Sequence, residues 1–163
     1  MKSFANHTFL TKSISIVLVV TGVLGLVTVG MMYIPYIPEL LEFGQAMNWF
    51  DLLFSSSLAI LGVISGIALW RKKRWAFIAA SAYFAIQLIV FELPNFVWAP
   101  SSGINLTQSY ALGYDGLGNF GCGLNFFALG MLILLFLAYK QTSTVSQAAS
   151  NEEPDSDAVG RVA

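Results

Sequence analysis

Long apolar runs that end at or near charged residues dominate the sequence. Four segments approach the roughly 20 apolar residues that a helix needs to cross the hydrocarbon core of a bilayer. They cover residues 13–34, 52–70, 75–91 and 119–139. Strands of an outer-membrane barrel alternate apolar and polar residues over about ten positions, whereas these segments are apolar on every side. The pattern therefore predicts four transmembrane helices.

Four spans predict an all-α fold, an antiparallel up-down four-helix bundle in the membrane. The connection at residues 71–74 is so short that the second and third helices must form a hairpin. Residues 1–140 would form this transmembrane domain, and the polar, mildly acidic residues 141–163 a disordered cytoplasmic tail. A cleaved signal peptide is the alternative for the first segment, but its apolar run exceeds the usual length of about 7–15 residues.

With four spans, all eight Lys and Arg residues fall on one side of the membrane. They are Lys2, Lys12, Arg71, Lys72, Lys73, Arg74, Lys140 and Arg161. The charged residues of the other side are the acids Glu39, Glu42, Asp51, Glu92 and Asp115. Because cytoplasmic loops are enriched in Lys and Arg, this positive-inside pattern predicts that both termini are cytoplasmic. The predicted location is a plasma membrane or a bacterial inner membrane.

The two outer loops differ in length and character. A short interfacial helix that begins near Pro38 is one prediction for the first loop, because Pro suits the first turn of a helix. An irregular loop, or an early start of the second helix, is the alternative. The second loop, residues 92–118, is long, and long loops in compact domains are often functional. Its candidate contacts with a partner are Asn95, Trp98, Tyr110 and Tyr114.

Asp51 and Glu92 are the candidate functional acids of the outer side. Each lies at the predicted outer end of a span, and the two spans are neighbours in the hairpin. Their carboxylates could therefore approach one another, and ionisable groups near the hydrocarbon are often functional, for example as cation or proton sites. Two close carboxylates would raise the pKa of one of them. The alternative is that both acids only mark the membrane boundary in contact with water.

Small residues at four-residue spacing mark candidate contacts between helices. Gly62 and Gly66 form a GxxxG motif in the second span, and Ala76 and Ala80 form a similar pair in the third. Such pairs let helices approach closely. They predict packing inside the bundle, with a homo-oligomer or a partner subunit as the alternative.

Polar residues and glycines also occur in the third and fourth spans. For Gln87 and Asn125 we expect hydrogen bonds to a neighbouring helix. Residues 116–121 spell GxGxxG, but the dinucleotide fingerprint requires a preceding strand, so the glycines indicate a flexible entry to the fourth helix or close backbone packing. Cys122, in the same stretch, is expected to be a buried structural thiol.

The composition suits lipid and excludes several kinds of chemistry. The chain is 56% hydrophobic and 10% charged, against roughly 25% charged residues in soluble domains. The only histidine, His7, lies outside the spans, which excludes a haem held by two histidines in the bundle. We predict no catalytic set, no cofactor and no metal site, because no His/Cys cluster is present. A net charge of −1 gives no basic patch for nucleic acid.

Three hypotheses for function follow, and they belong to different classes. The leading one is a non-enzymatic accessory, assembly or protective subunit. It would bind a protein partner, or a second copy, through its helix faces and the 92–118 loop. The second is an oligomeric channel or carrier, with Asp51 and Glu92 in an acidic vestibule that attracts cations. The third is a membrane enzyme that acts on lipid and uses the same two acids as general acid and base.

Overall fold

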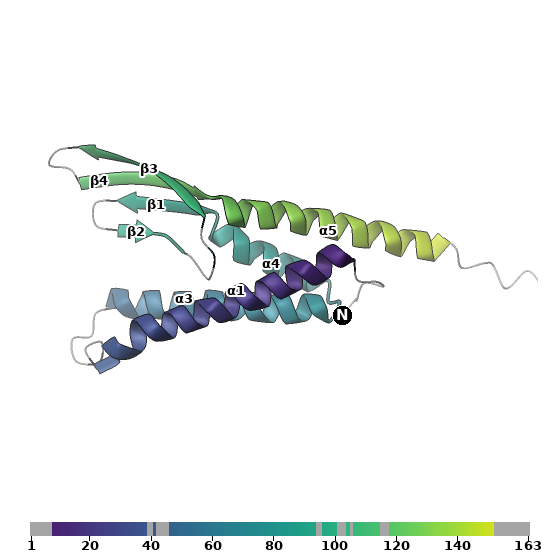
Figure 1. The fold of residues 1–163 in the computed structure, drawn as a ribbon, viewed down its shortest axis with the longest axis horizontal. Helices are drawn as coiled ribbons and strands as arrows, with labels where there is room; N and C mark the ends of the chain where they lie inside the picture. The colour runs from purple at the N-terminus through teal and green to yellow at the C-terminus, as the bar shows by residue number, and fades with distance from the viewer. Residues whose placement is uncertain are drawn as a thin grey trace, which may run out of the picture.

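The computed structural model describes residues 8–38, 41, 46–93, 96–100, 104, 106–114 and 118–151. Figure 1 shows helices at both ends of this chain and strands between α4 and α5. The helices are α1 (Phe9–Tyr33), η1 (Ile34–Tyr36), α3 (Ala46–Trp70), α4 (Trp75–Ile86) and α5 (Phe126–Asn151). The strands are β1 (Ile89–Leu93), β2 (Phe96–Trp98), β3 (Thr107–Tyr114) and β4 (Gly118–Asn125).

In the described part of the chain, three helices are long and apolar enough to cross a membrane. Their apolar stretches are Phe9–Tyr36, Trp49–Trp70 and Phe126–Ser143. These stretches overlap the first, second and fourth predicted spans. The prediction of a mostly helical chain is therefore confirmed, and the three candidate spans support the prediction of a membrane protein.

α4 differs from the predicted third span of residues 75–91. It ends at Ile86 after 12 residues, a length of about 18 Å, so the prediction of a helix to residue 91 is wrong. Gln87 is the C-cap residue, and its Nε2 donates to the carbonyl of Tyr83 at 3.1 Å. That carbonyl is one of the last four, which a helix leaves without an internal partner. The β-branched and aromatic residues at 89–91 favour the strand that follows.

The beginning of α5 corrects the fourth predicted span. Residues 119–125 belong to β4, and the helix begins only after them. Asn125 caps the helix, because its Oδ1 accepts from the backbone N–H of Phe127 at 3.1 Å and of Ala128 at 3.3 Å. Asn125 and Gln87 therefore cap helix ends, a role that the prediction of bonds between helices did not anticipate.

The four strands form one antiparallel sheet in the order β2-β1-β4-β3. β1 is an inner strand, with Phe91 opposite Trp98 on β2 and opposite Cys122 on β4. Where the helices join the sheet, the backbone N–H of Asn125 donates to the carbonyl of Leu88 at 2.9 Å. The all-α prediction is therefore only partly right. Long helices are present, but most of the described part of the 92–118 segment, which was expected to be a loop, forms strands.

The start of α3 and the end of α5 also differ from the predicted boundaries. α3 begins at Ala46, ahead of the predicted start at residue 52, so Asp51 lies within the helix. α5 continues to Asn151, so residues 141–151 of the predicted disordered tail are helical. The predicted interfacial helix near Pro38 lies mostly outside the described residues, and so does the rest of the tail.

α1 and α3 pack closely at two glycines. A Cβ atom at Gly22 would lie 2.7 Å from the backbone nitrogen of Val63, and one at Gly66 would lie 2.9 Å from the carbonyl oxygen of Ser15. The Ser15 hydroxyl also donates to the carbonyl of Gly66 at 2.6 Å. Gly66 of the GxxxG motif therefore serves the contact between α1 and α3.

Gly62, the other glycine of the motif, faces α4. A Cβ atom at this position would lie 2.8 Å from Cε2 of Tyr83. The Tyr83 side chain is fully buried, and its hydroxyl donates to Oγ1 of Thr21 on α1 at 3.3 Å. Ala76 and Ala80 are buried on the same helix. Tyr83 therefore fills the centre of the packing between α1, α3 and α4.

The turn at residues 71–74 joins α3 to α4. The N–H of Lys72 donates to the carbonyl of Leu69 at 3.0 Å, and that of Lys73 to the carbonyl of Ala68 at 2.9 Å. This is the Schellman pattern of a helix C-terminus. Lys72 adopts the left-handed conformation that the pattern requires, with φ of 58°.

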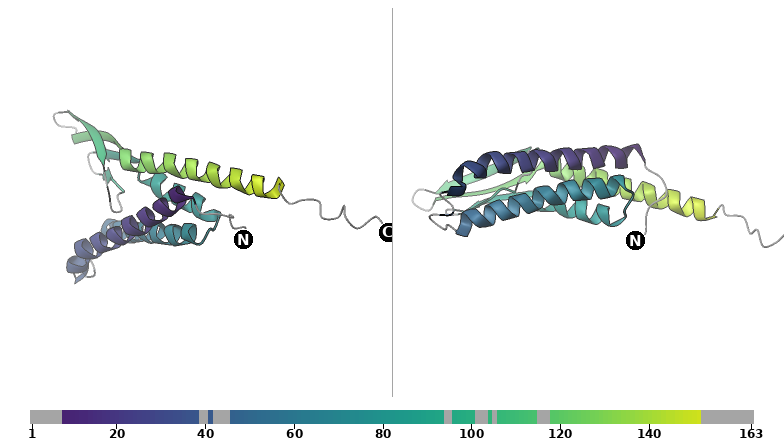
Figure 2. Two further views of the ribbon diagram at one scale, coloured as in Figure 1. Left: turned by 45° about the vertical axis from the view of Figure 1, so that its right-hand side comes forward. Right: turned by 90° about the horizontal axis from the view of Figure 1, so that it is seen from below.

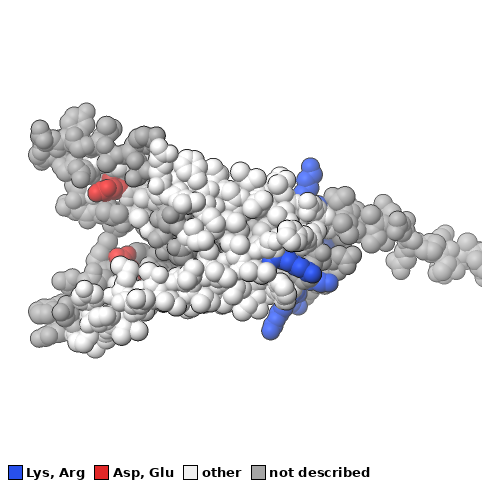
Figure 3. All heavy atoms as spheres, in the orientation of Figure 1, with Lys and Arg blue, Asp and Glu red and all other residues white. Residues whose placement is uncertain are grey.

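Charge divides the described surface into two ends. Figure 3 shows Lys and Arg at one end and Asp and Glu at the other. We call them the basic end and, because the strands lie there, the strand end. Figures 1 and 2 show the α1–α3 pair and the sheet diverging towards the strand end. The molecule therefore has the form of a wedge.

Candidate functional site: the strand-end cleft

A cavity of about 360 Å³ lies at the strand end, between α1, α3 and residues 98–100. We call it the strand-end cleft. Its lining combines polar and apolar side chains. The polar ones are Thr28, Tyr33, Asp51 and Ser55, and the large apolar ones are Met32, Phe50, Phe54 and Trp98.

A row of aromatic rings connects α3 to the sheet beside the cleft. Phe50 and Phe54 stack one helical turn apart, with ring centroids 5.7 Å apart. Phe54 contacts Trp98 of β2 at 5.2 Å, and Trp98 stacks on Phe91 of β1 at 6.0 Å. Each such pair contributes about 0.5–1.5 kcal/mol beyond the burial of its area. The row therefore holds β2 against α3.

Asp51 supplies the carboxylate of the cleft. It lies one helical turn before Ser55 on α3, and Tyr33 of α1 belongs to the same lining. A carboxylate accepts hydrogen bonds, and the two hydroxyls both donate and accept them. Among the residues that the structure describes, the lining contains no cation. A group that carries a positive charge or several N–H donors would therefore complement this cleft.

Glu92 lies on β1 and does not line the cleft. The ring contacts place Phe91 and Trp98 on the face of the sheet that looks towards α3. Successive residues of a strand point to opposite faces, so Glu92 points away from α3. The structure does not bring the Asp51 and Glu92 carboxylates together. The positions of Asp51 on α3 and Glu92 on β1 therefore give no support to the predicted acid pair.

The predicted contacts of the 92–118 loop lie in different places. Trp98 lines the cleft, whereas Tyr110 and Tyr114 belong to β3, which pairs with β4. Asn95 lies outside the described residues. Cys122 of β4 is exposed rather than buried as expected. β3 is at one end of the strand order, so it is an edge strand of the described sheet.

The sequence prediction missed most of the cleft lining. Asp51 was singled out, but its neighbour Ser55 was counted only as part of a span. Phe50 and Phe54, like Asp51 and Ser55, are four residues apart, which is the spacing of neighbours on one helix face. The spacing has this meaning only if Phe50 and Asp51 lie in the helix, and they do because α3 begins at Ala46 rather than at the predicted residue 52.

The carboxylate, hydroxyls and rings of the cleft can form hydrogen bonds and stacking contacts with a bound group. Among the residues that the structure describes, no three His, Cys, Asp or Glu side chains form a group that could hold a metal ion. The sequence matches no protein-family model, and comparison with curated proteins and with solved structures gave no significant match. The geometry of the cleft is therefore the basis for assigning a function.

Proposed function

We propose that the chain is a non-enzymatic interaction subunit of a membrane, whose strand-end cleft holds a segment of a partner membrane protein. The observation that carries this proposal is the mixed lining of the cleft, in which aromatic rings stand beside Asp51, Ser55 and Tyr33. A purely apolar lining would suit lipid chains. A carboxylate near the membrane boundary instead favours a partner segment that supplies a cation or N–H donors.

The proposal includes four membrane crossings, with both termini in the cytoplasm. α1 and α3 have 25 residues each, about 37 Å, and cross as helices. The third crossing combines α4 with the strand β1, which has 5 residues and adds about 16 Å to the helix. Their sum of about 34 Å matches a hydrocarbon core of about 30 Å. β4 and α5 then form the return crossing.

The charge distribution supports the orientation of these crossings. Lys and Arg gather at the basic end, which the positive-inside rule places in the cytoplasm. The strand end, with the cleft, is then on the outer side. Backbone at membrane depth needs hydrogen-bond partners, which the sheet supplies for its inner strands β1 and β4. Residues 109–114 of the edge strand β3 offer a further surface, because an extended partner segment can pair with such an edge.

Site-specific photo-crosslinking tests whether a partner occupies the cleft. Met32 lines the cleft and is 60% exposed, and Ile78 is 77% exposed outside it. A photoreactive amino acid at Met32 is expected to crosslink to one protein in native membranes. The same amino acid at Ile78 serves as the matched control and is expected not to capture that protein. Capture of the same protein at both positions would contradict a partner seated in the cleft.

A matched pair of acid variants tests the role of Asp51. Asp51→Asn removes the charge in the cleft, so recovery of the crosslinked partner in mild detergent is expected to fall about tenfold, the effect of roughly 1.4 kcal/mol. Glu92→Gln removes a charge on the opposite face of the sheet and is expected to leave recovery within about twofold of wild type. Unchanged recovery with Asp51→Asn would remove the acid from the proposal.

The single cysteine offers a test of orientation. The proposal places Cys122 of β4 at membrane depth, so Cys122→Ala removes this thiol first. In that background Tyr36→Cys, at a position that is 57% exposed in η1, is expected to be labelled by a membrane-impermeant maleimide in intact cells. In the same background, Lys73→Cys is expected to be labelled only from the cytoplasmic side. The reverse pattern would contradict the proposed orientation.

The other two hypotheses receive no support from the geometry. Both the cation channel and the lipid-acting enzyme relied on Asp51 and Glu92 acting together, and the sheet separates these residues. In addition, Tyr83 fills the centre of the packing between three helices. We therefore propose only the interaction subunit.

A further inference from the structure

A second cavity, of about 570 Å³, lies near the basic end between α4 and α5. We call it the basic-end groove. Its lining includes Arg74, Trp75, Ile78 and Ser81 from the α4 side, and Phe136 and Tyr139 from α5. It shares no lining residue with the strand-end cleft and has no part in the proposed function.

The groove has apolar walls and an aromatic contact at one end. Ile78 is 77% exposed and Phe136 67% exposed, one on each helix. Phe77 and Tyr139 meet edge to face between the helices, with ring centroids 5.5 Å apart. Ser81 has a small side chain, which leaves space between α4 and α5. An apolar slot of this kind suits a hydrocarbon chain.

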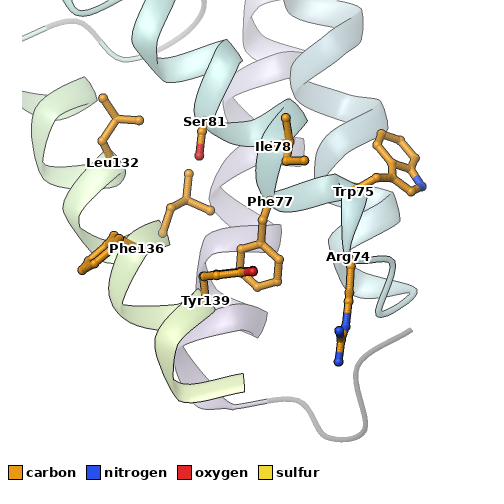
Figure 4. A pocket seen from close by; sticks show the side chains of 9 residues that line it. Arg74, Trp75, Phe77, Ile78, Ser81, Leu132, Phe136 and Tyr139 are labelled. Atoms are coloured by element: carbon orange, nitrogen blue, oxygen red, sulfur yellow. The ribbon is translucent and has the colours of Figure 1, made fainter. Parts of the chain in front are cut away.

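The lining changes from polar to apolar along the groove. In Figure 4, Arg74 lies at the basic end, whereas Ser81, at the level of the apolar Leu132, lies at the opposite end of the groove. Seven residues of helix separate them, a distance of about 10 Å. Trp75 and Tyr139 lie nearer to Arg74, and such rings favour the headgroup zone of a bilayer. The order of charge, amphipathic rings and apolar walls matches the order of groups in a phospholipid.

We infer that the basic-end groove binds one anionic phospholipid. The guanidinium of Arg74 holds the phosphate, because its planar fork can donate two hydrogen bonds to it. One acyl chain lies between α4 and α5, against Ile78 and Phe136. An anionic lipid is favoured over a zwitterionic one because the cation of Arg74 belongs to the lining of the groove itself. The volume falls within the range of about 300–1,000 Å³ that is usual for ligand sites.

Native mass spectrometry of the full chain can test this inference. The protein is released from nanodiscs that contain equal amounts of phosphatidylglycerol and phosphatidylcholine, and wild type is expected to retain one phosphatidylglycerol. Arg74→Gln is expected to lower the ratio of the two retained lipids about five- to tenfold. Arg71→Gln is the matched control, because Arg71 belongs to the same turn but does not line the groove. It is expected to change the ratio by less than about twofold.

A second pair of variants tests the acyl-chain part without changing any charge. Ser81→Leu fills the groove and is expected to abolish lipid retention. Ala82→Leu, at an exposed position outside the groove, is expected to preserve it. Soluble glycerol phosphate is expected not to displace the lipid, because it lacks the chain.

Several outcomes would overturn the inference. Wild type could retain the two lipids equally, or Arg71→Gln and Arg74→Gln could have equal effects. Glycerol phosphate could displace the lipid, or the protein could be released as a dimer without lipid. The last outcome would mean that a second copy covers the groove. None of them bears on the partner of the strand-end cleft, because the two sites lie at opposite ends and are probed by different variants.

Discussion

The molecule has two halves that differ in secondary structure. One is the α1–α3 pair, and the other is built from α4, the sheet and α5. α1 and α3 are continuous helices that approach closely at Gly22 and Gly66. In the other half α4 is short. The chain changes from helix to strand after Gln87, and it changes back from strand to helix at Asn125. The strand-end cleft and the basic-end groove both border this second half. The cleft lies between the two halves, with most of its lining on α1 and α3, whereas the groove lies within the second half. The comparison indicates that the cavities lie where the composite half departs from the close helix packing of the α1–α3 pair.

The largest expected effect concerns the packing of the α1–α3 pair. A Cβ atom at Gly22 would lie within 3 Å of backbone atoms of α3, at Val63 and Ala59, whereas one at Gly130 of α5 would meet no atom within 4 Å. Gly22→Ala is expected to lower the free energy of unfolding by about 2–3 kcal/mol. Gly130→Ala is expected to raise it by about 0.5–1 kcal/mol, because alanine favours a helix interior. Unfolding in mixed micelles measures both, and equal effects would remove the distinction between the two halves.

A smaller effect is expected where β4 becomes α5. Asn125→Ala removes the cap of α5 and is expected to cost about 1–2 kcal/mol. Asn125→Ser keeps an acceptor and should recover most of that loss. Hydrogen exchange is expected to increase in β4 and in the first turn of α5, while α1 and α3 stay protected. An increase that spreads equally through all helices would show that the two halves unfold as one unit.

The smallest effect is expected where the two halves meet. Tyr83→Phe removes the hydroxyl that donates to Thr21 but keeps the ring against Gly62. Thr21 still donates to the carbonyl of Val17. The expected loss is therefore about 0.5–1 kcal/mol of the free energy of unfolding. A loss as large as that of Gly22→Ala would mean that the hydrogen bond, rather than the ring, holds α4 to the pair.

The continuous helices could be predicted from sequence because their signal is local. The apolar runs at 13–34 and 52–70 each fit a single helix, although Lys12 and Asp51, which bound the runs, lie inside α1 and α3. The start of α3 at Ala46 was harder to place, because the residues before Asp51 are less apolar. The contacts of Gly62 and Gly66 with different helices depend on tertiary packing, which the GxxxG spacing alone does not reveal.

The composite half could not be predicted in the same way. An apolar run of 17 residues at 75–91 is compatible with one helix or with a short helix followed by a buried strand, and periodicity does not separate these possibilities. Gln87 and Asn125 were the available signals, because both are polar residues that end or begin a helix. The pairing of β1 with β4 joins residues about thirty positions apart, and no local pattern specifies such a pairing.

The central claim is that β1 pairs with β4 in a sheet that presents Phe91 and Glu92 on opposite faces, and one disulfide experiment tests it most directly. Phe91 is the direct partner of Cys122, the only cysteine of the chain. Opposed residues of antiparallel strands have Cα atoms about 4.5–5.5 Å apart, within the range for a disulfide. Phe91→Cys is therefore expected to form an intramolecular disulfide with Cys122 on mild oxidation. Glu92→Cys, on the other face, is expected to keep both thiols free, whereas equal crosslinking of the two variants, or none in Phe91→Cys, would contradict the account.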